Sequence, residues 1–196
     1  MTELQSEILP VKQNDDPKDE EEKSQAQLDY DAGQQFLENN DTGQAANSFH
    51  NSYLGFKEEN NLHGVARAAD KLGDVCMMME KYERAREHFK VAQKICTDDY
   101  DRFSLFVLDK KLADISYKLK DYNEAISQYL DILDTYQGNN NPEGAVKTLE
   151  TMAEIYIEMG EKKKAADSYM VAASIHRNFK HKRHAAKLED KAKALE

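Results

Sequence analysis

The sequence predicts an all-α solenoid in which about four helical hairpins are stacked in a row and followed by a C-terminal capping helix. Two observations support this prediction. The chain of 196 residues aligns with itself at a shift of 40 residues without a gap, and it contains only 3 Pro and 8 Gly. A strict period indicates a repeat array, and the shortage of turn residues favours long helices over strands and turns.

Three columns of small or aromatic residues recur along the chain. The first column holds Gly33, Gly73, Ala113 and Ala153. The second, twelve residues later, holds Ala45, Ala85, Ala125 and Ala165. The third, four residues further on, holds Phe49, Phe89, Tyr129 and Tyr169. The twelve-residue spacing leaves room for the end of one helix, a short turn and the start of another, so each repeat is predicted to be a helical hairpin whose columns are folding positions.

The chain divides into an N-terminal tail, the repeats and a final helix. Residues 1–23 hold eight acids, three lysines and two prolines without a helical apolar period, which predicts a disordered acidic tail. Residues 24–182 hold four repeats, at about 26–65, 66–105, 106–145 and 146–182. Residues 183–196 are predicted to form the capping helix, with the alternative that the chain was cut from a longer array.

Turn signals within and between the repeats set the expected helix bounds. The predicted helices lie near residues 24–38, 42–57, 64–79, 82–97, 103–119, 122–136, 143–159 and 162–177, and a ninth begins near Arg183.

The column residues resemble the tetratricopeptide repeat (TPR) family. The segments LGDVCMMMEKYERAREHFKVA and LADISYKLKDYNEAISQYLDI each carry that family's Leu-Gly/Ala pair, the Tyr before the second helix, the Ala and the aromatic residue. The usual repeat has 34 residues and a Pro near its end. Here the period is 40 and the Pro is replaced, which is more similar to the long-repeat subclass of LGN, Tonsoku-like proteins, kinesin light chain and bacterial long-repeat proteins. The resemblance implies a right-handed superhelix whose first helices line a concave groove for a peptide.

The same resemblance assigns groove-facing positions to side chains of the first helices. The peptide-binding candidates are Gln34, Arg67, Asp70, Asp74, Met77, Lys110, Asp114, Tyr117, Lys147, Glu150, Glu154 and Ile157. Asp74, Asp114 and Glu154 form one column, where a carboxylate can accept peptide hydrogen bonds or pair with Lys or Arg. We therefore expect a protein or peptide partner of basic or mixed charge. The alternative of a merely solvated helix face stays open.

Composition and motifs argue against other function classes. The net charge of −10 opposes binding to a phosphate backbone, so no nucleic-acid partner is expected. The chain lacks an apolar run of 18 residues and a signal-peptide pattern, which predicts no membrane partner and a cytoplasmic location. His181 and His184 have no third ligand beside them, so no metal is expected. Cofactor motifs and a singular pair of acids are absent, so neither a cofactor nor a catalytic residue is predicted.

The sequence thus favours a non-enzymatic adaptor that binds a peptide segment of a partner in the concave TPR groove. Two alternatives stay open. The array could be a structural scaffold that self-associates into a homo-oligomer, or a regulatory TPR protein that changes shape when a peptide binds.

Overall fold

The structure is a computed structural model that describes residues 23–195. These residues form nine α-helices: α1 (Gln25–Glu38), α2 (Thr42–Glu58), α3 (Leu62–Met78), α4 (Tyr82–Asp98), α5 (Arg102–Lys118), α6 (Tyr122–Gly138), α7 (Pro142–Glu158), α8 (Lys162–Asn178) and α9 (Lys182–Lys193). Every predicted helix is confirmed, with bounds within two residues of those expected. The predicted disordered tail falls almost wholly outside the described residues.

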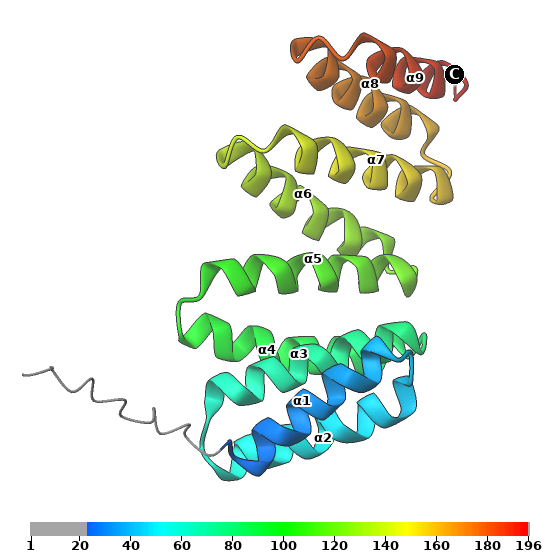
Figure 1. The fold of residues 1–196 in the computed structure, drawn as a ribbon. Helices are drawn as coiled ribbons and strands as arrows, with labels where there is room; N and C mark the ends of the chain where they lie inside the picture. The colour runs from blue at the N-terminus through cyan, green and yellow to red at the C-terminus, as the bar shows by residue number, and fades with distance from the viewer. Residues whose placement is uncertain (1–22, 196) are drawn as a thin grey trace, which may run out of the picture.

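The helices are stacked in chain order into an all-α superhelical solenoid (Figure 1). The odd-numbered helices are the first helices of the hairpins and the even-numbered helices are the second. Turns within hairpins lie on one edge of the stack. Turns between hairpins, from α2 to α3, α4 to α5, α6 to α7 and α8 to α9, lie on the opposite edge (Figure 1).

The turns repeat every twenty residues, at half the period seen in the sequence. One residue of each turn has a positive φ: Asn40, Asn60, Glu80, Tyr100, Lys120, Asn140, Gly160 and Lys180. In the first turn the N–H of Asp41 donates to the carbonyl of Phe36 at 2.8 Å, and the N–H of Asn40 donates to that of Leu37 at 2.9 Å. These bonds satisfy the last carbonyls of the helix while a left-handed residue reverses the chain.

The three sequence columns form the contact between the helices of each hairpin, as predicted. Ala45, Ala85, Ala125 and Ala165 are fully buried, and the aromatic residue four positions later is at most 5% exposed. A Cβ added at Gly73 would lie 2.3 Å from the ring of Phe89. The small residue of the first helix therefore makes room for the aromatic ring of the second.

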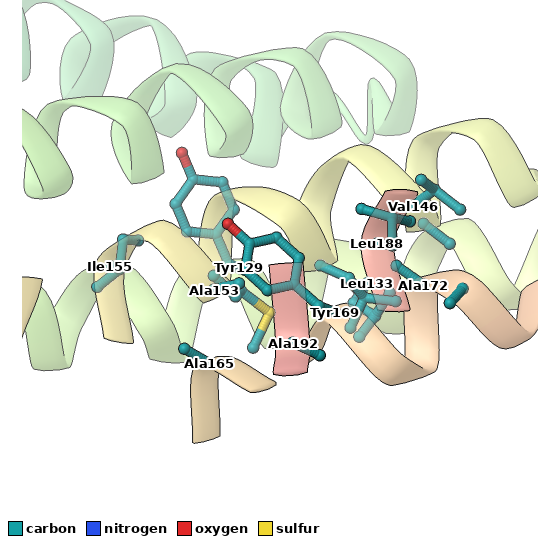
Figure 2. Close-up of a cluster of buried hydrophobic side chains, with 14 of the residues drawn as sticks. Tyr129, Leu133, Val146, Ala153, Ile155, Ala165, Tyr169, Ala172, Leu188 and Ala192 are labelled. Atoms are coloured by element: carbon teal, nitrogen blue, oxygen red, sulfur yellow. The ribbon is translucent and has the colours of Figure 1, made fainter. Parts of the chain in front are cut away.

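The buried side chains form three clusters along the stack. One joins α1 to α3, a second joins α3 to α5, and the largest joins α5 to α9. Figure 2 shows the largest cluster, to which α6 contributes Tyr129 and Leu133, α7 contributes Val146, and α9 contributes Leu188 and Ala192. Helices α3 and α5 each belong to two clusters, so they connect successive parts of the core.

Candidate functional site

A groove opens between α3 and α5, the first helices of the second and third repeats. It has a volume of about 410 Å³, and the C-terminal half of α4 forms part of its wall. Its apolar lining includes Leu62, Ala66, Ile95, Phe103 and Val107. Leu62 is 65% exposed and Phe103 is 79% exposed. Large apolar side chains this exposed, gathered beside a hollow, are typical of a binding surface.

Aromatic side chains fill the equivalent space at two other junctions between repeats. Near the end of α2, Phe56 packs so closely on Gly64 that a Cβ there would lie 2.4 Å from the ring. Near the end of α6, Tyr136 packs on Gly144 with the same 2.4 Å approach. Each glycine is required because the ring occupies the space of its missing side chain.

The junction between α4 and α5 lacks this aromatic residue. The positions equivalent to Phe56 and Gly64 are Cys96 and Ser104, and both line the groove. The smaller Cys96 side chain, which is 8% exposed, leaves unfilled the space that a ring takes elsewhere. The groove therefore results from one break in the aromatic column, which is visible in the sequence once the repeats are aligned.

Four carboxylates line the groove: Asp70, Asp98, Asp99 and Asp101. Asp101 caps the N-terminus of α5, where its Oδ1 accepts the backbone N–H of Ser104 at 3.1 Å. Hydrogen bonds from the side chain and backbone of Ser104 lower the pKa of Asp101. The groove thus combines an apolar lining with a negative rim.

Lys111 of α5 ties the groove's two first helices together. Its Nζ lies 2.6 Å from Oδ1 of Asp70 and 2.7 Å from Oδ1 of Asp74, both on α3. It also lies 4.9 Å from the ring centre of Phe89. Burial is the largest influence and lowers the pKa of Lys111, but the hydrogen bonds and charges of the two aspartates together raise it above its usual value. The lysine is therefore held charged between two helices.

The twelve predicted site residues all lie on the surface or partly buried, but they are not gathered in one place. The groove is lined by Arg67 and Asp70, and the guanidinium of Arg67 lies 4.3 Å from the ring centre of Tyr30. Asp74 does not line the groove, but it pairs with Lys111, which also pairs with the groove residue Asp70. The other nine extend along the stack outside the groove lining.

The predicted acidic column is partly engaged by the protein itself. Asp74 binds Lys111, and Asp114 accepts a hydrogen bond of 2.5 Å from the Tyr129 hydroxyl. Burial and that carboxylate raise the pKa of Tyr129. Glu154 is exposed, and among the described residues it has neither a hydrogen bond nor an ion pair through its side chain. The column therefore contributes contacts between helices as well as exposed charge.

Other charged candidates also have contacts within the protein. Glu150 lies 3.4 Å from Lys191, which joins α7 to α9, and Lys147 lies 2.9 Å from Glu143. Lys110 lies 5.0 Å from the ring centre of Phe106. Gln34 is exposed. Their role in binding a peptide stays a prediction.

The predicted apolar column is only partly available at the surface. Met77 packs against the core cluster of α3 to α5, and Tyr117 packs against that of α5 to α9. The Tyr117 hydroxyl donates to Glu158 at 2.8 Å, and burial with this carboxylate raises the pKa of Tyr117 to about 12. Ile157 is 41% exposed. Met77 and Tyr117 therefore contribute to folding.

The sequence analysis missed most of the groove. Asp98, Asp99 and Asp101 fit a turn signal between repeats, and the repeat pattern predicts no role for Phe103. The acidic run next to an exposed aromatic residue could have identified them, because the equivalent turn at 138–141 is Gly-Asn-Asn-Asn. Lys111 was missed because its role depends on its distance to another repeat.

In the part of the chain from 23 to 195, no group of three or more His, Cys, Asp or Glu side chains is arranged to hold a metal ion. No helix within the same residues has the length and apolar character needed to cross a membrane.

The sequence matches the family model described as SNAP, soluble NSF attachment protein, over residues 14–141. The chain belongs to the SNAP family. This match covers the first three hairpins and the groove of this SNAP-family chain. No curated protein sequence matches it.

Solved structures resemble this SNAP-family chain at low sequence identity. Apo RapI has a TM-score of 0.68 at 17% identity over 86% of this chain and 62% of RapI. A Rap protein complexed with competence and sporulation factor has a TM-score of 0.61 at 14% identity, over 83% of this chain and 45% of that protein. The chain thus spans less than two thirds of either Rap protein.

A putative kinesin light chain from Podosopora anserina, described as having TPR-like repeats, has a TM-score of 0.51. It is 12% identical over 89% of this chain and 97% of its own length. These likenesses confirm the predicted TPR-like fold.

Proposed function

We propose that the chain is a non-enzymatic adaptor whose groove between α3 and α5 binds a linear segment of another protein. The observation that carries this proposal is the apolar groove with a rim of four aspartates. Stacked helices offer a preformed surface, so a partner segment bears most of the ordering cost. The expected segment places an apolar side chain between Lys or Arg residues, because such a segment matches both the lining and the charge of the groove.

The names of the relatives agree with a protein-binding role. The family name describes attachment to NSF, and one similar Rap protein was solved with competence and sporulation factor. We infer the class of function from these names and the partner chemistry from the groove. A cytoplasmic location remains part of the proposal.

The first experiment measures binding of fluorescent peptides by anisotropy. One peptide carries Leu or Phe between Lys and Arg residues, and its control carries the same apolar residue between Glu residues. We expect the basic peptide to bind and about 1 M salt to weaken it, since screening is strong at that concentration. Preferential binding of the acidic peptide would contradict the proposed charge preference.

A groove-filling variant tests the location. Cys96→Phe with Ser104→Gly recreates the ring and glycine of the neighbouring junctions. We expect helicity and Tm to be retained, because the array already accommodates this pair twice, and peptide affinity to fall about tenfold or more. Unchanged affinity in a folded variant would show that the peptide binds elsewhere.

A second pair of variants separates local charge from total charge. Asp98→Asn with Asp99→Asn removes charge from the rim. Glu58→Gln with Glu59→Gln removes the same charge at the equivalent positions one repeat earlier, outside the groove lining. We expect only the first variant to weaken peptide binding strongly. Equal losses would indicate general electrostatic attraction in place of a site.

One observation favours a regulatory role as a second candidate. Asp70 lines the groove and also binds Lys111, which ties α3 to α5. A basic ligand that pairs with Asp70 competes with Lys111 and so alters the contact between the two repeats. This candidate predicts a change in the X-ray scattering radius on peptide binding. The same radius with and without saturating peptide would contradict the regulatory role, and only the adaptor role would remain.

A further inference from the structure

The turns between hairpins lie on one edge of the stack (Figure 1). The charge of the residues at these turns changes along that edge. The first two turns are acidic: Glu58 ends α2 and Glu59 follows it, and Asp98 ends α4 and is followed by Asp99 and Asp101, with Arg102 at the start of α5 as a basic neighbour. The third turn, residues 138–141, has no charged side chain, and Glu143 at the start of α7 pairs with Lys147 at 2.9 Å. In the fourth turn Lys180 is basic, and Lys182 and Arg183 follow it at the start of α9.

Most of this charge is not neutralised locally. Among residues 23–195, Asp98 and Asp99 have no ion-pair partner, and neither do Lys180, Lys182 and Arg183. Exposed charges of opposite sign on one edge attract a second molecule in the antiparallel sense.

Apolar side chains lie beside both charged turns. Phe103, 79% exposed, and Leu62, 65% exposed, lie at the acidic groove. Phe179, 55% exposed, lies in the basic turn, directly before Lys180. The α8–α9 turn thus presents an exposed apolar side chain beside basic residues. The ligand proposed for the groove has the same chemistry. The same chain cannot bring the two together, because α6 and α7 lie between them in the stack (Figure 1).

We propose that a second copy of this chain is an occupant of the groove. Two copies lie antiparallel along their inter-hairpin edges, and the α8–α9 turn of each inserts Phe179 into the α3–α5 groove of the other. The two contacts are identical, and the uncharged turns at 138–141 face each other between them. Such reciprocal contacts close the assembly as a two-fold dimer. This inference rests on the proposed function, because it uses the same groove and the same ligand chemistry.

Analytical ultracentrifugation of the chain at about 0.1 M salt tests the dimer. We expect a monomer–dimer equilibrium that shifts toward monomer near 1 M salt, because the contacts are exposed charges. A monomer at every concentration up to about 1 mM, or a series of larger species, would overturn the inference.

Charge exchange tests the contact itself. Variant A carries Asp98→Lys and Asp99→Lys, and variant B carries Lys182→Glu and Arg183→Glu. We expect each alone to dimerise at least about tenfold more weakly, since each opposes like charges. An equal mixture of A and B restores opposite charges at both contacts, so it should form a mixed dimer. Circular dichroism shows whether each variant is folded.

A matched control and the groove-filling variant complete the test. Glu58→Lys with Glu59→Lys changes net charge as much as variant A but lies outside the groove lining, and it should leave the dimer intact. The folded Cys96→Phe, Ser104→Gly variant should be monomeric. A mixture of A and B that stays monomeric, or a dimer that survives groove filling, would overturn the inference. Peptide binding by a chain that never dimerises would overturn it while supporting the proposed function.

Discussion

At the scale of single residues, the backbone of the turns depends on one left-handed position in every twenty. In the described part of the chain, seven of the eight positions with positive φ hold a residue with a side chain, and only Gly160, at φ +78°, is a glycine. Residues other than glycine are disfavoured in this conformation by about 1 kcal/mol or more. The regular turn is therefore maintained by the helices on both sides.

Two glycines in open space allow this cost to be measured. A Cβ at Gly160 or at Gly138 would meet no atom within 4 Å, but only Gly160 has a positive φ, while Gly138 is the last residue of α6. We expect Gly160→Ala to lower the free energy of unfolding by about 1 kcal/mol through backbone strain. Gly138→Ala should raise it slightly, because alanine favours the helix. Urea unfolding gives both values, and a change of the same sign in both variants would contradict the explanation.

The rings of three histidines cluster at the last turn. The ring of His176 lies 5.7 Å from that of His181 and 5.2 Å from that of His184 between ring centres. Burial, followed by the charges of His184 and His181, lowers the pKa of His176. The unfolded chain therefore takes up a proton more readily than the folded chain, and stability falls as pH drops below the unfolded value of about 6.5.

We expect the Tm to fall between about pH 7.5 and pH 5.5, and His176→Gln to reduce this fall. Part of the pH dependence of the Tm should remain in the His176→Gln variant, because burial also lowers the pKa of His88. The double variant with His88→Gln should show the flattest profile. An unchanged profile in the folded His176→Gln variant would contradict the role of that histidine.

At the scale of helices, three carboxylates predicted to bind a ligand, those of Asp70, Asp74 and Glu150, also form contacts between repeats. Lys111 binds Asp70 and Asp74 across α3 and α5, and Lys191 reaches Glu150 across α7 and α9. The repeat period predicted which helix carries each residue. It could not predict these pairs, because a pair depends on the distance between side chains of successive hairpins.

The Lys111 contact predicts a measurable loss of stability. Its side chain is 25% exposed, and those of Asp70 and Asp74 are 27% and 30% exposed, so solvent screens the contact only in part. We expect Lys111→Met to lower the free energy of unfolding by about 1–2 kcal/mol, since it leaves Asp70 and Asp74 close together with only the longer Lys71–Asp74 pair of 3.7 Å. Adding Asp70→Asn and Asp74→Asn should recover part of the loss.

Lys71 provides the matched control. It occupies the same repeat position as Lys111, but within residues 23–195 its one ion pair is with Asp74 of its own helix at 3.7 Å. Lys71→Met should therefore change stability by about 0.5 kcal/mol or less. Equal losses for the two lysines would show that the contact between helices has no special contribution.

Helix bounds and core columns were predictable because they depend on patterns within one or two helices. The Ala45 and Phe49 columns set the hairpin contact directly. The groove depends on a residue that is absent, since Cys96 stands where Phe56 and Tyr136 stand in other repeats. Comparing the repeats for what they share identifies the fold, whereas the departures from that common pattern identify the candidate site.

At the scale of the whole molecule, the stack has no single centre. Each core cluster spans only a few successive helices, and the largest reaches from α5 to α9. In such an array stability is approximately a sum over neighbouring units, so a local defect is expected to remain local. A compact domain would instead distribute the loss over its whole core.

Amide hydrogen exchange in three variants tests this property. Leu188 is 4% exposed and Phe89 is fully buried, so replacing either by Ala should cost about 2–5 kcal/mol. Leu188→Ala should speed exchange in α8 and α9 alone, and Phe89→Ala should do so from α3 to α5. Leu130→Ala is the control, because it makes the same Leu-to-Ala change at a side chain that is 45% exposed. It should not speed exchange in any helix. Faster exchange in α1 and α2 of the Leu188→Ala variant would mean that the nine described helices unfold as one unit, and the groove would then depend on every repeat.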